Sequence, residues 1–269
     1  MNRIQKRFAT LKAEGRSALI PYLCAGDPDL ETSIAIFKNA VAAGADLIEV
    51  GMPFSDPVAD GPSIQTASNR ALAGGQNTER TFEVVRAIRE IDNEIPVVLM
   101  GYYNPVYSYG CEQFVEDAVD AGIDGFIICD LPPEMDHELK PFTEAADAAL
   151  IRFVTPASDE ARIERVLDGA SGFIYVISFA GVTGASKPDM SHVQHNIELV
   201  RAKSDLPVCV GFGVSTPEQA KAVGEIADGV IVGSALVNAI AESLDDTGAA
   251  TDATATAAST RIEALAAAL

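Results

Sequence analysis

The sequence predicts an α/β protein that folds as a single (β/α)8 barrel, the TIM-barrel architecture, over residues 1–269. Eight short apolar runs are spread along the chain, and amphipathic stretches separate them. Most of the runs are continuous rather than alternating, which is typical of parallel strands that are buried on both faces. Strands that alternate with helices favour a parallel sheet, and α/β barrels commonly reach this length as one domain.

The expected elements follow one another in a regular order. The expected strands are 18–23, 46–50, 97–101, 125–129, 150–153, 173–177, 208–210 and 229–232. The clearest expected helices are 31–43, 79–91, 112–121, 134–148 and 218–227. Several of them begin near Pro, Thr, Ser or Asp followed by acidic residues, as helix amino termini do. Gly44, Gly122 and Gly169 are expected to end helices just before the next strand.

The end of the chain differs in composition from the rest. Residues 245–260 are rich in Asp, Thr and Ala and contain few apolar residues, so we expect a surface linker before a last helix at 261–269. No internal repeat or boundary of a second domain is evident. A doubly wound open sheet is the alternative fold, but no GxGxxG motif follows the first expected strand.

The chain is strongly acidic, with 39 Asp and Glu against 19 Lys and Arg and a formal net charge of −20. This charge disfavours nucleic acid and anionic membrane surfaces as partners. An anionic substrate must therefore be held by a local device such as backbone amides. Acidic residues, abundant Ala and scarce Lys also suggest a halophilic protein, whose acidic surface is screened by high salt.

The cysteines indicate a reducing compartment. Cys24, Cys111, Cys129 and Cys209 have neither CxxC nor metal-ligand spacing. No signal peptide is evident, and no apolar stretch is long enough to span a bilayer. We therefore expect a soluble, cytoplasmic protein with reduced thiols.

A carboxylate lies inside the second expected strand. Glu49 stands among the apolar residues of 46–50, and strand alternation places it on the same face as Leu47. Such a carboxylate is costly unless it is paired, neutralised or used in chemistry. A structural Glu is the alternative, but Asp60 follows on the Gly- and Pro-rich loop that leaves the same strand. The two acids together favour a catalytic site.

Glycines follow the seventh and eighth expected strands, as Gly211-Phe-Gly213 and Gly233-Ser234. The active site of a (β/α)8 barrel lies at the carboxyl ends of the strands, and the loops after strands seven and eight usually bind phosphate. A short helix that begins near Ser234 would direct its amino-terminal amides at an anion. The sequence therefore predicts a phosphate site that needs no Lys or Arg.

The other loops carry weaker signals. Asp27 is expected to help begin the helix after the first strand, and Asp130 and Asn104 are ordinary turn residues. The loop 178–187, after the sixth strand, is long and rich in small residues.

The positions of the lysines and histidines argue against some kinds of active site. None of the seven lysines lies in an expected strand, which disfavours a Schiff-base aldolase. His192 and His195 have i,i+3 spacing without an evident third ligand, so a solvated helix face is favoured and no metal site is expected. The residues alone predict acid–base chemistry on a phosphorylated substrate, and they leave the substrate open.

The run EVGMPFSDPVADGPSIQ, residues 49–65, resembles the tryptophan synthase α subunit family. The likeness extends over nearly the whole chain, through residues 21–28, 102–104, 130–134, 181–184, 211–213 and 232–234. The resemblance implies a lyase of L-tryptophan biosynthesis. Its reaction would be the retro-aldol cleavage of indole-3-glycerol phosphate to indole and glyceraldehyde 3-phosphate.

The resemblance also implies roles for individual residues. Glu49 would be the general acid and base, and Asp60 would accept the indole N–H. Burial should raise the pKa of Glu49 above about 4.3, as a general acid near neutral pH requires. Thr183, on the lid 178–190, would orient Asp60 when the lid closes. The residues expected to bind substrate are Tyr22, Met100, Tyr102, Cys129, Phe153, Tyr175, Thr183, Gly184, Phe212, Gly213, Gly233 and Ser234. Of these, Gly184, Gly213, Gly233 and Ser234 would hold the phosphate.

The chain departs from the family pattern at three positions. Cys24 replaces a usual Thr, Phe179 stands where Arg is common, and Tyr22 stands where Phe is common. These departures bear on lid movement and pocket polarity but leave the acid–base pair in place.

The family likeness implies a partner, a β subunit that carries pyridoxal phosphate and receives indole through a tunnel in an αββα heterotetramer. Residues 53–60 and 102–105 would face it. No cofactor is expected in this chain. Two alternatives remain: another phosphate-binding barrel enzyme, such as indole-glycerol-phosphate synthase or an epimerase, and a non-catalytic subunit that activates a partner. The first would need a strand Lys or a metal site, and Glu49 with Asp60 argues against the second.

Overall fold

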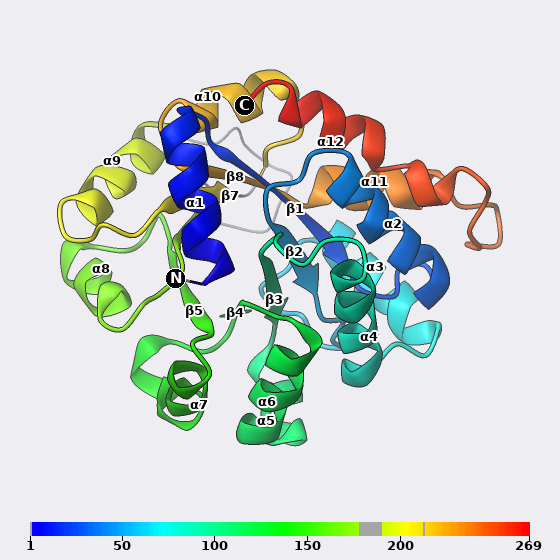
Figure 1. The fold of residues 1–269 in the computed structure, drawn as a ribbon, viewed down its shortest axis with the longest axis horizontal. Coiled ribbons are helices and arrows are strands. Elements are labelled where there is room, and N and C mark those ends of the chain that lie inside the picture. The colour runs from blue at the N-terminus through cyan, green and yellow to red at the C-terminus, as the bar shows by residue number, and fades with distance from the viewer. Residues whose placement is uncertain (1, 178–189, 212) are drawn as a thin grey trace.

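Eight parallel strands close into a barrel in chain order, and helices surround it (Figure 1). The structure is a computed structural model, and it describes residues 2–177, 190–211 and 213–269. The strands are β1 Ala18–Cys24, β2 Ile48–Gly51, β3 Val97–Gly101, β4 Gly125–Ile128, β5 Ala149–Val154, β6 Ile174–Ile177, β7 Val208–Gly211 and β8 Gly229–Val232. Each lies within about two residues of its predicted range, so the predicted (β/α)8 barrel is confirmed.

The helices follow the strands as a (β/α)8 barrel requires. The α-helices are α1 Arg3–Glu14, α2 Leu30–Ala42, α3 Pro62–Ala73, α4 Thr78–Arg89, α5 Tyr103–Tyr109, α6 Cys111–Ala121, α7 Lys140–Ala145, α8 Glu160–Leu167, α9 Met190–Arg201, α10 Pro217–Gly224, α11 Ser234–Glu242 and α12 Ser259–Ala266. Two short 3₁₀ helices, η1 Pro133–Glu138 and η2 Thr254–Thr256, complete the set for the described ranges. None of these helices has the length and apolar character needed to cross a bilayer.

The single helix predicted at 134–148 was wrong. The segment divides into η1 and α7, and Leu139 separates them. Pro141 lies in the first turn of α7, where its missing N–H is tolerated. A helix that continued through Pro141 from η1 would lose a backbone hydrogen bond there, which explains the division.

The expected role of Asp27 was also wrong. Asp29 is the N-cap of α2, and its side chain accepts a hydrogen bond from the backbone N–H of Thr32. Asp27 is instead buried and accepts two hydrogen bonds from the guanidinium of Arg70 on α3, at 2.7 and 2.8 Å. This pair fixes the loop after β1 to α3.

The acidic and Ala-rich tail is less exposed than its composition suggests. Thr254 and Ala258 are buried, and η2 packs on α2, where Asn39 donates to the backbone oxygen of Ala255 at 2.7 Å. The last helix, α12, begins two residues earlier than expected and buries Ile262 and Leu265. Small Ala and Thr side chains allow this close contact between the tail and the barrel.

Strand alternation divides the core into two layers. Leu47 belongs to the apolar cluster inside the barrel, whereas Ile48 and Val50 belong to the cluster between the strands and the helices. Glu49 therefore points into the barrel, as the sequence predicted. At the amino-terminal end α1 covers the opening of the barrel (Figure 1). Phe8 of α1 packs against Phe173 inside the barrel.

A repeated pair of hydrogen bonds joins the strands in twos at the amino-terminal end. In each case, a residue just before an even-numbered strand donates its backbone N–H to the carbonyl of a residue at the start of the preceding, odd-numbered strand. The backbone N–H of that odd-strand residue in turn donates to the side chain of the first residue. The pairs, given as even-strand residue with odd-strand residue, are Asp46 with Leu19, Asp124 with Val97, Ser171 with Leu150 and Asp228 with Val208. The side-chain bonds measure 2.8 to 2.9 Å.

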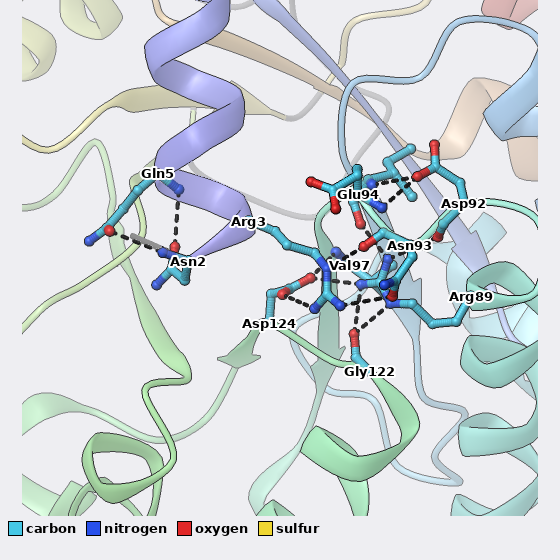
Figure 2. Close-up of polar contacts among 11 residues, drawn as sticks. Asn2, Arg3, Gln5, Arg89, Asp92, Asn93, Glu94, Val97, Gly122 and Asp124 are labelled. Atoms are coloured by element: carbon cyan, nitrogen blue, oxygen red, sulfur yellow. Dashed lines mark hydrogen bonds and ion pairs between the residues drawn. The ribbon is translucent and has the colours of Figure 1, made fainter.

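Arginines surround the carboxylates of this set. Asp124 lies between Arg3 of α1 and Arg89 of α4, which donate to its two oxygens at 2.9 and 2.8 Å (Figure 2). Asp46 accepts two hydrogen bonds from Arg16 at 2.8 and 2.7 Å. These three of the 19 basic residues therefore lie at the end of the barrel opposite the carboxyl ends of the strands, where they stabilise the fold.

Candidate active site

A pocket opens at the carboxyl ends of the strands, and it contains most of the predicted site residues that the structure describes. Those that line it are Tyr22, Glu49, Asp60, Met100, Tyr175, Gly213, Gly233 and Ser234. They come from β1, β2, β3 and β6 and from the segments that follow β2, β7 and β8. Residues far apart in the sequence are therefore brought together at the place where the sequence predicted an active site.

Glu49 is the most deeply buried ionisable group in this pocket. Its side chain is fully buried, and neither carboxyl oxygen has a hydrogen-bond partner among the described residues. Burial, with a smaller effect from the charge of Asp60, raises the pKa of Glu49 to about 8. A carboxyl group with this pKa holds a proton at neutral pH and can act as a general acid.

Asp60 lies on the loop between β2 and α3, at the rim of the same pocket. Burial raises the pKa of Asp60 to about 6, and the neighbouring Tyr102 hydroxyl opposes part of that rise. The Tyr102 hydroxyl also accepts a hydrogen bond from the backbone N–H of Ala59 at 3.0 Å, and its ring packs against Phe54. Tyr102 thus contacts the loop that carries Asp60 rather than lining the pocket.

Glycines make room for two tyrosines in the pocket wall. A β-carbon at Gly51 would lie 2.2 Å from the hydroxyl oxygen of Tyr22, and one at Gly211 would lie 2.3 Å from that of Tyr175. Both distances are far too short for a side chain to fit. Each tyrosine therefore lies across a glycine of the neighbouring strand, which brings its ring over the barrel mouth.

Two of the residues expected to bind substrate, Cys129 and Phe153, lie beside the pocket rather than in it. Cys129 and Phe153 line an adjacent cavity between the carboxyl ends of β4 and β5. The Phe153 ring still packs against Tyr175, with ring centroids 5.0 Å apart. Phe153 thus packs against Tyr175, which lines the pocket, without lining the pocket itself.

The far end of the pocket has the form of an anion site. Gly213 has a φ of 88°, in the region that favours glycine, and α11 begins at Ser234 directly after Gly233. Free amides at the start of this nine-residue helix point toward an anion placed there. No Lys or Arg is among the described residues that line the pocket.

Four residues discussed from the sequence lie outside the described residues. They are Phe179, Thr183 and Gly184 in the segment 178–189, and Phe212.

The pocket also contains residues that the sequence did not single out. They include Ile64 on α3, Val214 and Ser215 after β7, Ile231 on β8 and Asn238 on α11. Ile231 could have been found, because strand alternation places it on the same face as Gly233. Ile64 and Asn238 depend on how α3 and α11 pack at the rim, and no local pattern in the sequence indicates that packing.

The sequence matches the family model described as tryptophan synthase alpha chain over residues 8–266. The chain belongs to the tryptophan synthase alpha chain family. Its resemblance to this family, noted from residues 49–65, is therefore confirmed, and lyase action on indole-3-glycerol phosphate, the α reaction of tryptophan biosynthesis, is its activity.

Solved structures of tryptophan synthase have the same fold. The structure of tryptophan synthase subunit alpha from Legionella pneumophila is 37% identical, with a TM-score of 0.89, and the match covers 100% of this chain and 98% of that one. A structure of Mycobacterium tuberculosis tryptophan synthase is 37% identical, with a TM-score of 0.90, and the match covers 99% and 98%. The aminoacrylate-bound form from M. tuberculosis is 35% identical, with a TM-score of 0.88 and coverage of 100% and 99%.

Proposed function

We propose that Glu49 and Asp60 carry out the retro-aldol cleavage of indole-3-glycerol phosphate to indole and glyceraldehyde 3-phosphate. The observation that carries this assignment is the buried Glu49 carboxyl, which has no partner among the described residues and has a pKa near 8. Asp60 at the rim and the glycine-rich anion site at the far end of the same pocket support it.

The proposed steps use only proton transfers from this chain. Glu49 donates its proton to indole C3, which becomes tetrahedral and leaves positive charge on the ring nitrogen. Asp60 accepts a hydrogen bond from the indole N–H and stabilises that charge. The Glu49 carboxylate then takes the proton of the glycerol hydroxyl next to the ring. The carbon–carbon bond breaks, its electron pair restores the indole ring, and the aldehyde forms, so Glu49 ends the cycle protonated. These steps need no cofactor in this chain.

The substrate would lie across the pocket from one end to the other. Backbone amides near Gly213 and Gly233, with the Ser234 hydroxyl, would hold the phosphate. Met100, Tyr175 and Tyr22 would contact the indole or the glycerol chain. We assign Thr183, Gly184 and Phe212 to the same site on the family likeness alone.

The pH dependence of cleavage should be bell-shaped. Asp60 must be ionised and Glu49 must be protonated for the first step, so kcat/KM should rise with an apparent pKa near 6 and fall with one near 8. Because the two carboxyls interact, both values belong to the pair. The profile should be recorded between pH 4.5 and pH 9.5, and a rate that keeps rising above pH 9 would contradict the assignment of Glu49 as the acid.

We further propose that the chain works with a β subunit that carries pyridoxal phosphate, in an αββα heterotetramer. The support is the likeness to tryptophan synthase structures, including the aminoacrylate-bound form from M. tuberculosis. Two apolar side chains near the carboxyl ends of the strands would suit an interface: Val58 on the loop 53–60 is 84% exposed, and Tyr107 on α5 is 62% exposed.

The test of function measures glyceraldehyde 3-phosphate release from indole-3-glycerol phosphate by the purified chain, with and without a β subunit. Slow release that the β subunit accelerates would support the reaction and the partner together. Release that the β subunit does not accelerate would support the proposed reaction and contradict the proposed partner. No release under either condition, from a chain that is folded by circular dichroism, would overturn the assignment of the site.

Stability should depend on salt. We propose that the chain is halophilic and cytoplasmic, on the grounds of its net charge of −20 and its four free cysteines. The acidic surface repels itself in dilute buffer, and salt screens that repulsion, with a Debye length of about 3 Å at 1 M against about 10 Å at 0.1 M. The midpoint of thermal unfolding should therefore rise steadily from 0.1 M to 2 M KCl. An unchanged midpoint over this range would contradict halophily.

A further inference from the structure

Tyr22 spans the pocket from its anion end to its acid–base end. The β-carbon of Tyr22 would lie 3.4 Å from a β-carbon at Gly233, whereas its hydroxyl lies over Gly51 at the end of the strand that carries Glu49. Since β1 pairs with β8 on one side and with β2 on the other, the ring crosses the barrel mouth between these two neighbours. The hydroxyl therefore lies at the end of the pocket where bond cleavage is proposed.

The Tyr22 hydroxyl has no hydrogen-bond partner among the described residues, although the side chain is 94% buried (6% exposed) and lines the pocket. The ionisable groups that face it are Cys24, Asp60, Glu49 and Cys129, from β1, the loop after β2, β2 itself and the end of β4. Burial, reinforced by these groups, raises the pKa of the Tyr22 phenol well above its ordinary value, so it stays protonated and can donate. Among the described residues, only the two Glu49 carboxyl oxygens are fully buried side-chain polar atoms without a partner, so the Tyr22 hydroxyl is open to the pocket, and a molecule bound there can accept its hydrogen bond.

The substrate offers an acceptor in this position. Its glycerol chain joins the indole to the phosphate and carries two hydroxyls. The one next to the ring loses its proton to Glu49 in the proposed reaction, and the second is kept in glyceraldehyde 3-phosphate. A side chain that runs beside the path from the anion site to Glu49 can reach this second hydroxyl. A hydrogen bond from Tyr22 to this hydroxyl would be separate from the contacts assigned to Glu49, Asp60 and the glycine-rich loops.

We propose that the Tyr22 hydroxyl donates a hydrogen bond to the second glycerol hydroxyl, and that Tyr22 thereby selects substrates that carry it. This inference rests on the proposed function, because it places the phosphate at Gly233 and the reacting carbon at Glu49. It makes Tyr22 a residue that determines specificity and not only a surface that the substrate contacts.

The test pairs one variant with one altered substrate. Tyr22→Phe removes the hydroxyl and keeps the ring, and an analogue of indole-3-glycerol phosphate without the second hydroxyl removes the proposed acceptor. With the wild-type chain, kcat/KM for the analogue should be about tenfold lower than for the natural substrate, a loss of about 1.4 kcal/mol. Tyr22→Phe should show a similar loss with the natural substrate and no further loss with the analogue.

Tyr109→Phe is the matched control, because it removes a tyrosine hydroxyl that bonds to Asp117 on the helical surface, away from the pocket. It should process both substrates at the wild-type ratio. Thermal unfolding of each variant checks that the barrel is intact.

Two results would overturn the inference: equal activity of Tyr22→Phe and the wild type on the natural substrate, or losses that multiply when variant and analogue are combined. The second result would mean that the Tyr22 hydroxyl contributes through a protein group such as Asp60 and not through the second glycerol hydroxyl. Failure of the wild-type chain to cleave indole-3-glycerol phosphate would instead reject the proposed function itself, so the two failures are distinguishable.

Discussion

Replacement of Glu49 with glutamine is expected to abolish cleavage of indole-3-glycerol phosphate while the barrel stays folded. Glutamine has nearly the same shape as the protonated acid but cannot give a proton to indole C3 or take one from the glycerol hydroxyl. Loss of a general acid and base costs about 10²–10⁴-fold in rate, and here one group does both tasks, so the upper end of that range is expected. Single-turnover release of glyceraldehyde 3-phosphate measures the loss.

The same variant should be more stable than the wild type in alkali. The pKa of Glu49 is raised from 4.5 to about 8 on folding, so the folded chain holds a proton that the unfolded chain releases. The wild type therefore loses stability as the pH rises from about 4.5 to about 8, and glutamine, which is always neutral, does not. Thermal unfolding should give equal midpoints for the two proteins near pH 4 and a higher midpoint for Glu49→Gln at pH 9.

Glu112→Gln, on the surface of α6, is the control for both measurements, because it makes the same chemical change outside the pocket. It should keep full activity and the wild-type pH dependence of unfolding. Retained turnover in Glu49→Gln would mean that another group supplies the proton.

The largest effect on stability is expected from Asp124→Ala at the other end of the barrel. The Asp124 carboxylate accepts hydrogen bonds from Arg3, Arg89 and the backbone N–H of Val97 (Figure 2). Its removal leaves the buried N–H of Val97 without that acceptor and takes away the counter-charge of a largely buried guanidinium. We expect a loss of about 3–5 kcal/mol in the free energy of unfolding. Chemical denaturation in high salt measures it.

Asp120→Ala provides a close comparison. Asp120 at the end of α6 pairs with Arg86 of α4 at 3.7 Å, but both side chains are exposed. Exposed pairs of this kind contribute little, and salt weakens them further. Similar losses in the two variants would show that burial does not set the strength of these pairs. Both variants should cleave substrate normally while folded, because neither residue lies near the pocket.

The strands were predictable because parallel strands buried on both faces are continuous apolar runs, which few other segments of this chain contain. Helices were harder to place. The ranges of α3 and α5 were not anticipated, because α3 buries small residues such as Ala67 and Ala71, and α5 is a short aromatic segment after β3. Their helical form depends on packing against neighbours rather than on a strong local pattern.

The candidate site was predictable where strand alternation and loop position decide it. Glu49 follows from alternation, Asp60 from the loop after the same strand, and Gly213 and Gly233 from the rule that loops seven and eight bind phosphate. Phe153 shows where this reasoning ends. Phe153 is in register with Tyr175, but Tyr175 lines the pocket and Phe153 lines the neighbouring cavity. Nothing in the local sequence of the two strands distinguishes these two positions.

The reciprocal hydrogen bonds at the amino-terminal end have a consequence for the chemistry at the opposite end. Asp46 and Leu19 exchange two bonds, which can form at only one alignment of β2 against β1. Glu49 lies three residues beyond Asp46. A slip of one residue would turn Glu49 out of the barrel, and a slip of two would raise or lower it by about 6.6 Å, more than a proton transfer can bridge. Asp46 thus fixes the register of β2 against β1, and with it the position of the proposed proton donor along the barrel axis.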